Sequence, residues 1–196
     1  MNKKYLSCKE TAVLVRAALK ESFPGVKFSV KSDVYSGGAS IRIRWMDGPN
    51  PAQVDEVVSV FKGGYFDGMI DYQGSITSML DGELVRFGAD FIFTNRDYSD
   101  AMIERAIQAV ANKYGSGDEP YTVADYRSGK GYDKYPAGGE WSPNNSLQCL
   151  VNQDLSKRSE MQAKPSNTAA RAFPVYDDGY GMGGVSNIGN GYPKVA

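Results

Sequence analysis

Three aspartates provide the ligand type that a divalent metal ion would need. They are Asp47, Asp67 and Asp71, and hard cations prefer carboxylate oxygens. Asp47 and Asp67, however, each stand directly before a glycine, and Asp-Gly pairs are typical of tight turns. We therefore favour turns over a metal site and expect no metal or other cofactor.

Four cations are placed on one predicted surface. Apolar and polar residues alternate in 26–31 and again in 39–45, which predicts two strands joined as an antiparallel hairpin. The solvent-facing side of this hairpin would present Lys27, Lys31, Arg42 and Arg44. These side chains can contact phosphates, although we expect no aromatic residue on this face and hence no surface for base stacking. An ordinary solvated face that discourages edge aggregation is the simpler interpretation.

Aromatic residues gather after Gly115. Tyrosine and tryptophan are favoured at protein interfaces, and this segment has few aliphatic residues that could bury its aromatic side chains. We expect a docking surface formed mainly by Tyr121, Tyr126, Tyr132, Tyr135 and Trp141. Basic residues interleave with the tyrosines, so single-stranded nucleic acid and a solvated linker stay open as alternatives.

Histidine is missing from all 196 residues, and the two cysteines are far apart. Without histidine, Ser-His and Cys-His nucleophile pairs and nearly all zinc sites are excluded. Cys8 lies near the predicted start of a helix, where a thiolate is stabilised, but no base accompanies it. We expect a protein that is not an enzyme. The formal net charge of -1 does not by itself indicate a DNA-binding protein.

Three helices are predicted to position these residues. Ser7 and Glu10 form a capping box for a helix over 8–22. Asn50 and Pro51 begin a second helix, whose apolar stripe is Val54, Val57, Val58 and Phe61. Ser99 or Asp97 caps a third, regular helix that ends at Gly115.

A longer strand is predicted over 84–94, with Phe87, Ala89, Phe91 and Phe93 on one face. Residues 1–115 therefore predict an α+β domain in which an antiparallel sheet has helices packed mainly on one face. Residues 116–196 are rich in glycine, tyrosine and proline, and we expect a largely irregular C-terminal region whose one candidate helix is 146–161. We expect the first 115 residues to fold without that region. No apolar run is long enough to span a membrane, so we expect a cytoplasmic protein.

A family resemblance rests on three motifs in order. They are Phe23 to Val30, then Ile41 to Trp45 with Asp47-Gly48-Pro49, then Phe66 to Met69 with Asp71. Together they resemble the twenty-ninth of the large polyvalent protein-associated domains, over about residues 4 to 98. Members occur in phages, plasmids and conjugative elements, so the resemblance implies a mobile-element protein that acts against host defences.

Three functions follow as hypotheses. The first is a non-enzymatic protein in the bacterial cytoplasm that binds and blocks a defence protein or ribonucleoprotein complex, as anti-CRISPR and anti-restriction proteins do. Its expected contact residues are Tyr126, Tyr132, Tyr135, Trp141, Asp47, Phe66 and Asp67. The second is a nucleic-acid-binding accessory protein that uses Lys27, Lys31, Arg42 and Arg44. The third is a metal-dependent enzyme built on Asp47, Asp67 and Asp71.

Overall fold

The computed structural model describes residues 3–115, 120–137, 142 and 144–179, and the chain forms two compact units. The first unit takes the described residues of Met1–Trp45, Pro51–Asn95 and Met161–Ala196, and the second those of Met46–Asn50 and Arg96–Glu160. Each unit has its own buried apolar cluster. Helices and strands mix throughout the first unit, so the predicted α+β class is confirmed. Within the described residues, no helix is both long enough and apolar enough to cross a membrane.

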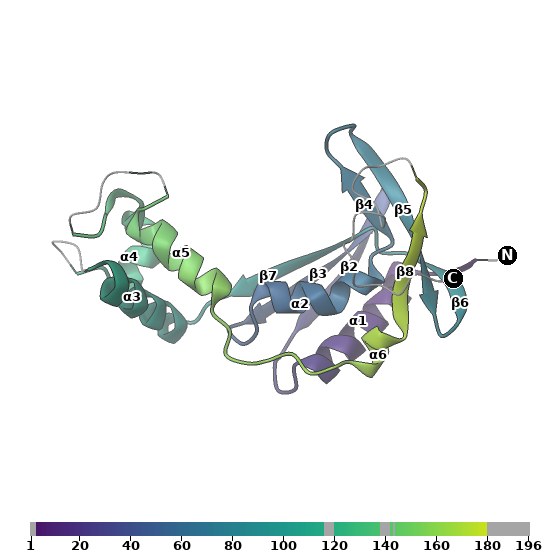
Figure 1. Ribbon diagram of the computed structural model, residues 1–196, viewed down its shortest axis with the longest axis horizontal. Helices are drawn as coiled ribbons and strands as arrows, with labels where there is room; N and C mark the ends of the chain where they lie inside the picture. Colours follow the sequence, from purple (N-terminus) through teal and green to yellow (C-terminus); the bar gives the residue numbers. More distant parts are fainter. Residues whose placement is uncertain (1–2, 116–119, 138–141, 143, 180–196) are drawn as a thin grey trace. The chain divides into compact units, whose positions relative to one another are not determined.

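The first unit contains two sheets (Figure 1). Its strands are β1 (Lys4–Leu6), β2 (Ser29–Tyr35), β3 (Gly38–Met46), β4 (Gly64–Asp67), β5 (Tyr72–Leu80), β6 (Glu83–Phe87), β7 (Phe91–Asp97) and β8 (Ala172–Asp177). The last residue of β3, Met46, and the last two of β7, Arg96 and Asp97, already belong to the second unit. Its helices are α1 (Cys8–Ser22), α2 (Pro51–Val58) with the 3-10 turn η1 (Ser59–Phe61), and α6 (Asn167–Ala170). One sheet has the order β2-β3-β7. The other has the order β1-β6-β5-β4, with β8 also paired to β5.

Helices α1 and α2 lie side by side and pack into the core with one face of the β2-β3-β7 sheet (Figure 1). The predicted capping box begins α1, because the Ser7 hydroxyl accepts the Glu10 N–H and the Glu10 carboxylate accepts the Ser7 N–H. Ile41, Ile43 and Trp45 point from β3 into this core, as their alternation predicts. The opposite face of the sheet is exposed, and on β2 and β3 it carries Ser29, Lys31, Arg42 and Arg44.

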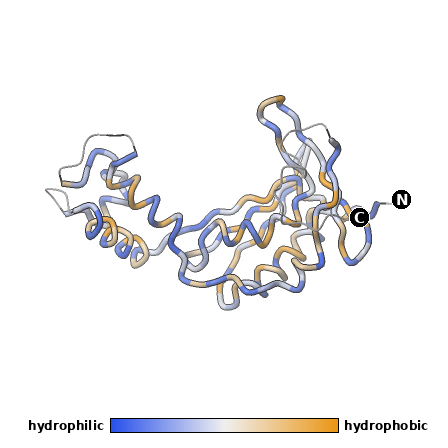
Figure 2. Tube along the Cα trace, in the orientation of Figure 1, coloured by the Kyte–Doolittle hydropathy of each residue, from blue (hydrophilic) through white to orange (hydrophobic). Residues whose placement is uncertain are grey.

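The second sheet projects a hairpin. Strands β4 and β5 pair antiparallel, and residues 68–71 form the turn between them. In Figure 2 the tip of this hairpin is coloured as hydrophobic. The other half of β5 pairs with β8, for example Met79 with Phe173.

The C-terminal segment is anchored through a carboxylate. Glu21 at the end of α1 accepts hydrogen bonds from the Thr168 N–H, 2.9 Å, and from the hydroxyls of Ser166 and Thr168, both 2.7 Å. These bonds hold the start of α6, which leads into β8. Residues 120–137, 142 and 144–179, the described part of the region expected to be largely irregular, thus contain more helix and strand than the sequence predicted. Strand β8 and the start of α6 are held by partners far away in the sequence.

The single strand predicted over 84–94 is wrong. The chain forms β6 and β7 there, in different sheets, with a break at Gly88. The Gly88 N–H donates to the Leu6 carbonyl at 2.7 Å, and a Cβ at this position would lie 2.6 Å from that same oxygen. This close approach of two backbones interrupts the strand.

The second unit is helical. Its elements are α3 (Asp100–Tyr114), α4 (Val123–Ser128), the 3-10 turn η2 (Lys130–Asp133) and α5 (Leu147–Lys157). Helix α3 is capped by Ser99 and ends at Gly115, which has a φ of 85°, as predicted. Helix α5 lies inside the predicted 146–161 helix, and its apolar side chains share a buried cluster with those of α3.

A buried arginine ties the second unit together. Arg96 is 7% exposed, and its guanidinium donates to four backbone carbonyls. The acceptors are Asp47 O at 2.9 Å, Gly48 O at 3.0 Å, Leu155 O at 3.1 Å and Arg158 O at 2.7 Å. Two of these carbonyls lie at the C-terminal end of α5, where a cation is favoured. Burial lowers the pKa of Arg96 from its ordinary value.

Candidate functional site

A groove crosses the exposed face of the β2-β3-β7 sheet. It has a volume of about 650 Å³ and is lined by Ser29, Lys31, Arg42, Ile43, Arg44, Phe93 and Asn95. The antiparallel register sets Lys31 directly opposite Arg42, and Ser29 opposite Arg44. Three of the four predicted cations thus meet in one groove. Lys27 lies before the start of β2 and does not line it.

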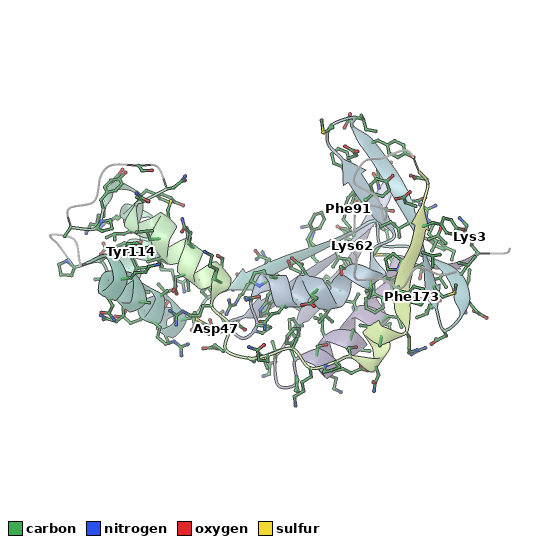
Figure 3. The ribbon with its side chains drawn as sticks, in the orientation of Figure 1. Lys3, Asp47, Lys62, Phe91, Tyr114 and Phe173 are labelled. Carbon is green, nitrogen blue, oxygen red and sulfur yellow. The ribbon has the colours of Figure 1, made fainter. Side chains whose placement is uncertain are left out.

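An aromatic residue lies on this basic face, contrary to the expectation from the sequence. After the break at Gly88, β7 buries Ile92 and turns Phe91 and Phe93 outward. Phe93 is 53% exposed, and its ring stacks on that of Phe91 at a centroid distance of 5.9 Å and an interplanar angle of 23°. Figure 3 labels Phe91. The prediction that Phe87, Phe91 and Phe93 share one face is wrong because the two strands belong to different sheets.

The groove has an uncompensated positive charge. No carboxylate lines it, and the structure gives none of its three cations an ion pair or hydrogen bond with another described residue. Like charges directly opposite each other destabilise a strand pair by about 0.2–1 kcal/mol. An anion bound between Lys31 and Arg42 would remove this cost.

The β4–β5 hairpin forms a second exposed surface. Phe66 and Ile70 are each 55% exposed and Met69 is 83% exposed. Asp67 is buried, and its Oδ1 accepts the Met69 N–H at 3.0 Å, which shapes the turn. Asp71 adopts a left-handed backbone with a φ of 50°. The outward direction of Ile70 was not predicted, since it depends on the turn geometry.

The three aspartates considered as metal ligands belong to different units. Asp47 lies in the second unit, where its Oδ1 accepts the Ser99 N–H at 2.9 Å and so supports the cap of α3. Asp67 and Asp71 lie in the β4–β5 hairpin of the first unit. Among the described residues, no cluster of three or more carboxylate or thiol side chains is placed to hold a metal.

The aromatic residues after Gly115 are not one exposed surface. Tyr126 packs against the cluster of α3 and α5 and donates to Asn152 Oδ1 at 2.8 Å. Tyr121 packs there too, and burial raises the pKa of both phenols. Tyr132 is 55% exposed and Tyr135 is half-buried, whereas Trp141 lies outside the described residues. The expectation that this segment cannot bury its tyrosines is wrong for Tyr121 and Tyr126, because α3 and α5 supply aliphatic partners.

Cys8 is not placed as a nucleophile. It is 3% exposed, and its thiol lies 3.5 Å from the Ser40 carbonyl. Burial raises the pKa of this thiol, which opposes formation of a thiolate. A buried structural residue is the interpretation that this geometry favours.

Comparison with known proteins gives a family match for the first part of the chain. Searches of curated proteins and of solved structures returned no match. A family model does match, over residues 6–99, and this region runs from the end of β1 through β7. It therefore includes the basic groove and the β4–β5 hairpin, whereas α5, α6 and β8 lie outside it. Residues 6–99 match the model of a family described as Large polyvalent protein associated domain 29.

Proposed function

We propose that this protein belongs to a phage or other mobile genetic element and acts by binding, without catalysis, to a host defence complex that it blocks. The family of residues 6–99 associates the chain with mobile elements. The chain has no histidine for acid–base chemistry. The partner is a bacterial defence protein or ribonucleoprotein of the kind that anti-CRISPR or anti-restriction proteins bind, in the cytoplasm of the host.

The observation that supports binding is the apolar tip of the β4–β5 hairpin. Phe66, Met69 and Ile70 are three large apolar side chains within five residues, and each is more than half exposed. Such side chains gathered on one projecting turn are favoured at protein–protein contacts. Methionine in particular adapts to the shape of a partner surface. In many interfaces a few central contact residues contribute most of the affinity, while the surrounding fold positions them.

A plating assay tests this proposal. Bacteria with an active CRISPR or restriction system would express the protein, and phage plating and plasmid transformation would be measured. We expect the wild-type protein to restore both. We expect the triple variant Phe66→Ser, Met69→Ser, Ile70→Ser to lose most of this protection, because a polar tip cannot replace the apolar contact.

The matched control is Val13→Ser, since Val13 is 60% exposed on α1 and lies outside the hairpin. It should protect as the wild type does. Circular dichroism would establish that all variants are folded. Absence of protection by the wild-type protein against a panel of defence systems would count against an anti-defence role. Full protection by the triple variant would show that the contact with the partner lies outside the hairpin.

A second candidate function is nucleic-acid binding by the basic groove. The observation that favours it is the convergence of Lys31, Arg42 and Arg44 without a carboxylate partner in the groove lining. A gel-shift assay at low salt tests it, since phosphate contacts release counterions and are strongest there. Binding that disappears in Arg42→Glu, Arg44→Glu would support this function.

A further inference from the structure

We propose that the groove on the β2-β3-β7 sheet binds single-stranded nucleic acid, with a base stacked on Phe93 and phosphates held by Lys31, Arg42 and Arg44. This inference rests on the second candidate function and names its ligand class.

The three cations of the groove favour a polyanion as its ligand. Strands in a sheet lie about 4.8 Å apart and residues i and i+2 about 6.6 Å apart. Arg42 and Arg44 are two residues apart on β3, and Lys31 is on the neighbouring strand opposite Arg42. Three cations thus occupy an area of roughly 5 by 7 Å, where successive phosphates of a short strand can contact them. The structure pairs none of the three with a carboxylate among the described residues, so this contact breaks no existing ion pair.

Phe93 adds a surface for base stacking, which a site for phosphate alone does not have. Phe93 lies on β7, which neighbours β3 on the side away from β2, so it borders the row of arginines. Its ring stacks on that of Phe91 at a centroid distance of 5.9 Å and is 53% exposed. An exposed phenyl ring is a surface for base stacking that accepts every base.

Geometry favours single strands over a duplex. In a duplex the base faces are stacked on one another, so a ring on a sheet surface cannot reach them without unstacking. Reading a duplex requires an element that enters a groove about 12 Å wide, and this face is a sheet surface rather than a projecting helix. Ser29 and Asn95 are the uncharged polar side chains at the groove. Because few polar side chains are available to contact base edges, we expect the groove to have little preference for base sequence.

The test is fluorescence anisotropy on the full chain with a labelled 15-nucleotide oligo-dT and, separately, a 15-base-pair duplex. We expect the single strand to bind at low salt at least about tenfold more tightly than the duplex. Three phosphate contacts predict a slope of log affinity against log salt of about −2, from about −0.7 per contact. Arg42→Gln should reduce the size of this slope by about 0.7.

Variants of the aromatic residue separate stacking from charge. Phe93→Ala should weaken single-strand binding by about tenfold or more, with the salt slope unchanged. Phe93→Trp should retain the affinity, which excludes misfolding as the cause of the loss. Phe66→Ala is the matched control, because Phe66 is equally exposed but lies on the hairpin. Lys9→Gln is the control for charge, since Lys9 is exposed on α1.

The outcomes distinguish the two levels of the proposal. If the duplex binds as tightly as the single strand, or if Phe93→Ala binds normally, stacking on this face is overturned while nucleic-acid binding stands. If neither ligand binds at low salt, both the inference and the second candidate function fail. The proposed blocking of a defence complex, which rests on the β4–β5 hairpin, does not depend on either result.

Discussion

Replacing Arg96 by methionine should destabilise the second unit more than any surface substitution. Methionine retains much of the side-chain volume but has no donor, so four backbone carbonyls lose their hydrogen bonds at a site that is 7% exposed. A hydrogen bond from a charged donor contributes about 1.5–3 kcal/mol, but bonds from one guanidinium are not independent. We therefore expect a total loss of about 3–5 kcal/mol, since each buried acceptor left without a partner costs about 1–3 kcal/mol and the four costs are not independent.

Urea unfolding followed by circular dichroism would measure the total loss. Hydrogen exchange would locate it, because amides of α5 should exchange about a hundredfold faster if 3 kcal/mol is lost. Amides of α1, in the other unit, should change less. The matched control is Arg105→Met, which removes an ion pair with Glu160 whose side chains are 55% and 36% exposed. An exposed pair of this kind contributes about 0–1 kcal/mol.

The reasoning would be refuted if the two variants unfolded within about 1 kcal/mol of each other. Water would then replace the guanidinium at the four carbonyls, and Arg96 would not be the residue that holds the segments of the second unit together.

Three further outcomes are expected. Hydrogen bonds from Thr168 and Ser166 lower the pKa of Glu21 below its usual 4.5. The ionised carboxylate of Glu21 therefore stabilises the folded protein above pH 4.5, and this stabilisation is lost as the pH falls through the lowered pKa. The difference in melting temperature between wild type and Glu21→Gln should therefore shrink between pH 7 and pH 3, and a constant difference would contradict this. Gly63→Ala should prevent correct folding, because the added Cβ would lie 1.8 Å from the Phe87 carbonyl oxygen. The control Gly68→Ala should melt as the wild type does, because its added Cβ would lie 3.7 Å from the nearest atom, in the Phe66 ring. The sequence predicts that the first 115 residues fold alone, but the packing of α5 on α3 and the pairing of β8 with β5 lead to the opposite expectation. Deletion of residues 116–196 should abolish the cooperative thermal transition, because each large aliphatic side chain that it exposes costs about 1.5–3 kcal/mol. A sharp transition in the shortened chain would show that neither α5 nor β8 is needed.

Local features were predictable because their partners lie within one helical turn. The capping box of Ser7 and Glu10, the Ser99 cap and the Gly115 end of α3 all formed where the sequence placed them. The strand 39–45 was predicted with the correct inward face, since alternation needs no knowledge of the partner strand. Three of the four predicted basic residues meet in the groove for the same reason.

The C-terminal end of the second helix was predicted less accurately. The sequence predicts one helix through Phe61, but α2 ends at Val58 and continues as the 3-10 turn η1. Val54, Val58 and Phe61 are still fully buried, so the apolar stripe was predicted correctly although the backbone tightens. Such tightening of the last turn satisfies carbonyls that have no partner further along.

Amino-acid sequence by itself determined α1, α3, the start of α2, the turns at aspartate and the polar face of β3, because these depend on neighbours at most four residues away. Tertiary structure alone decided that β8 pairs with β5, that α5 buries the face of α3, and that Phe93 joins the basic groove. The last depends on Gly88, where contact with the Leu6 backbone separates β6 from β7 and sends them to different sheets. Contacts between residues so far apart depend on which surfaces remain unburied after the local elements form, and no short pattern in the chain encodes that choice.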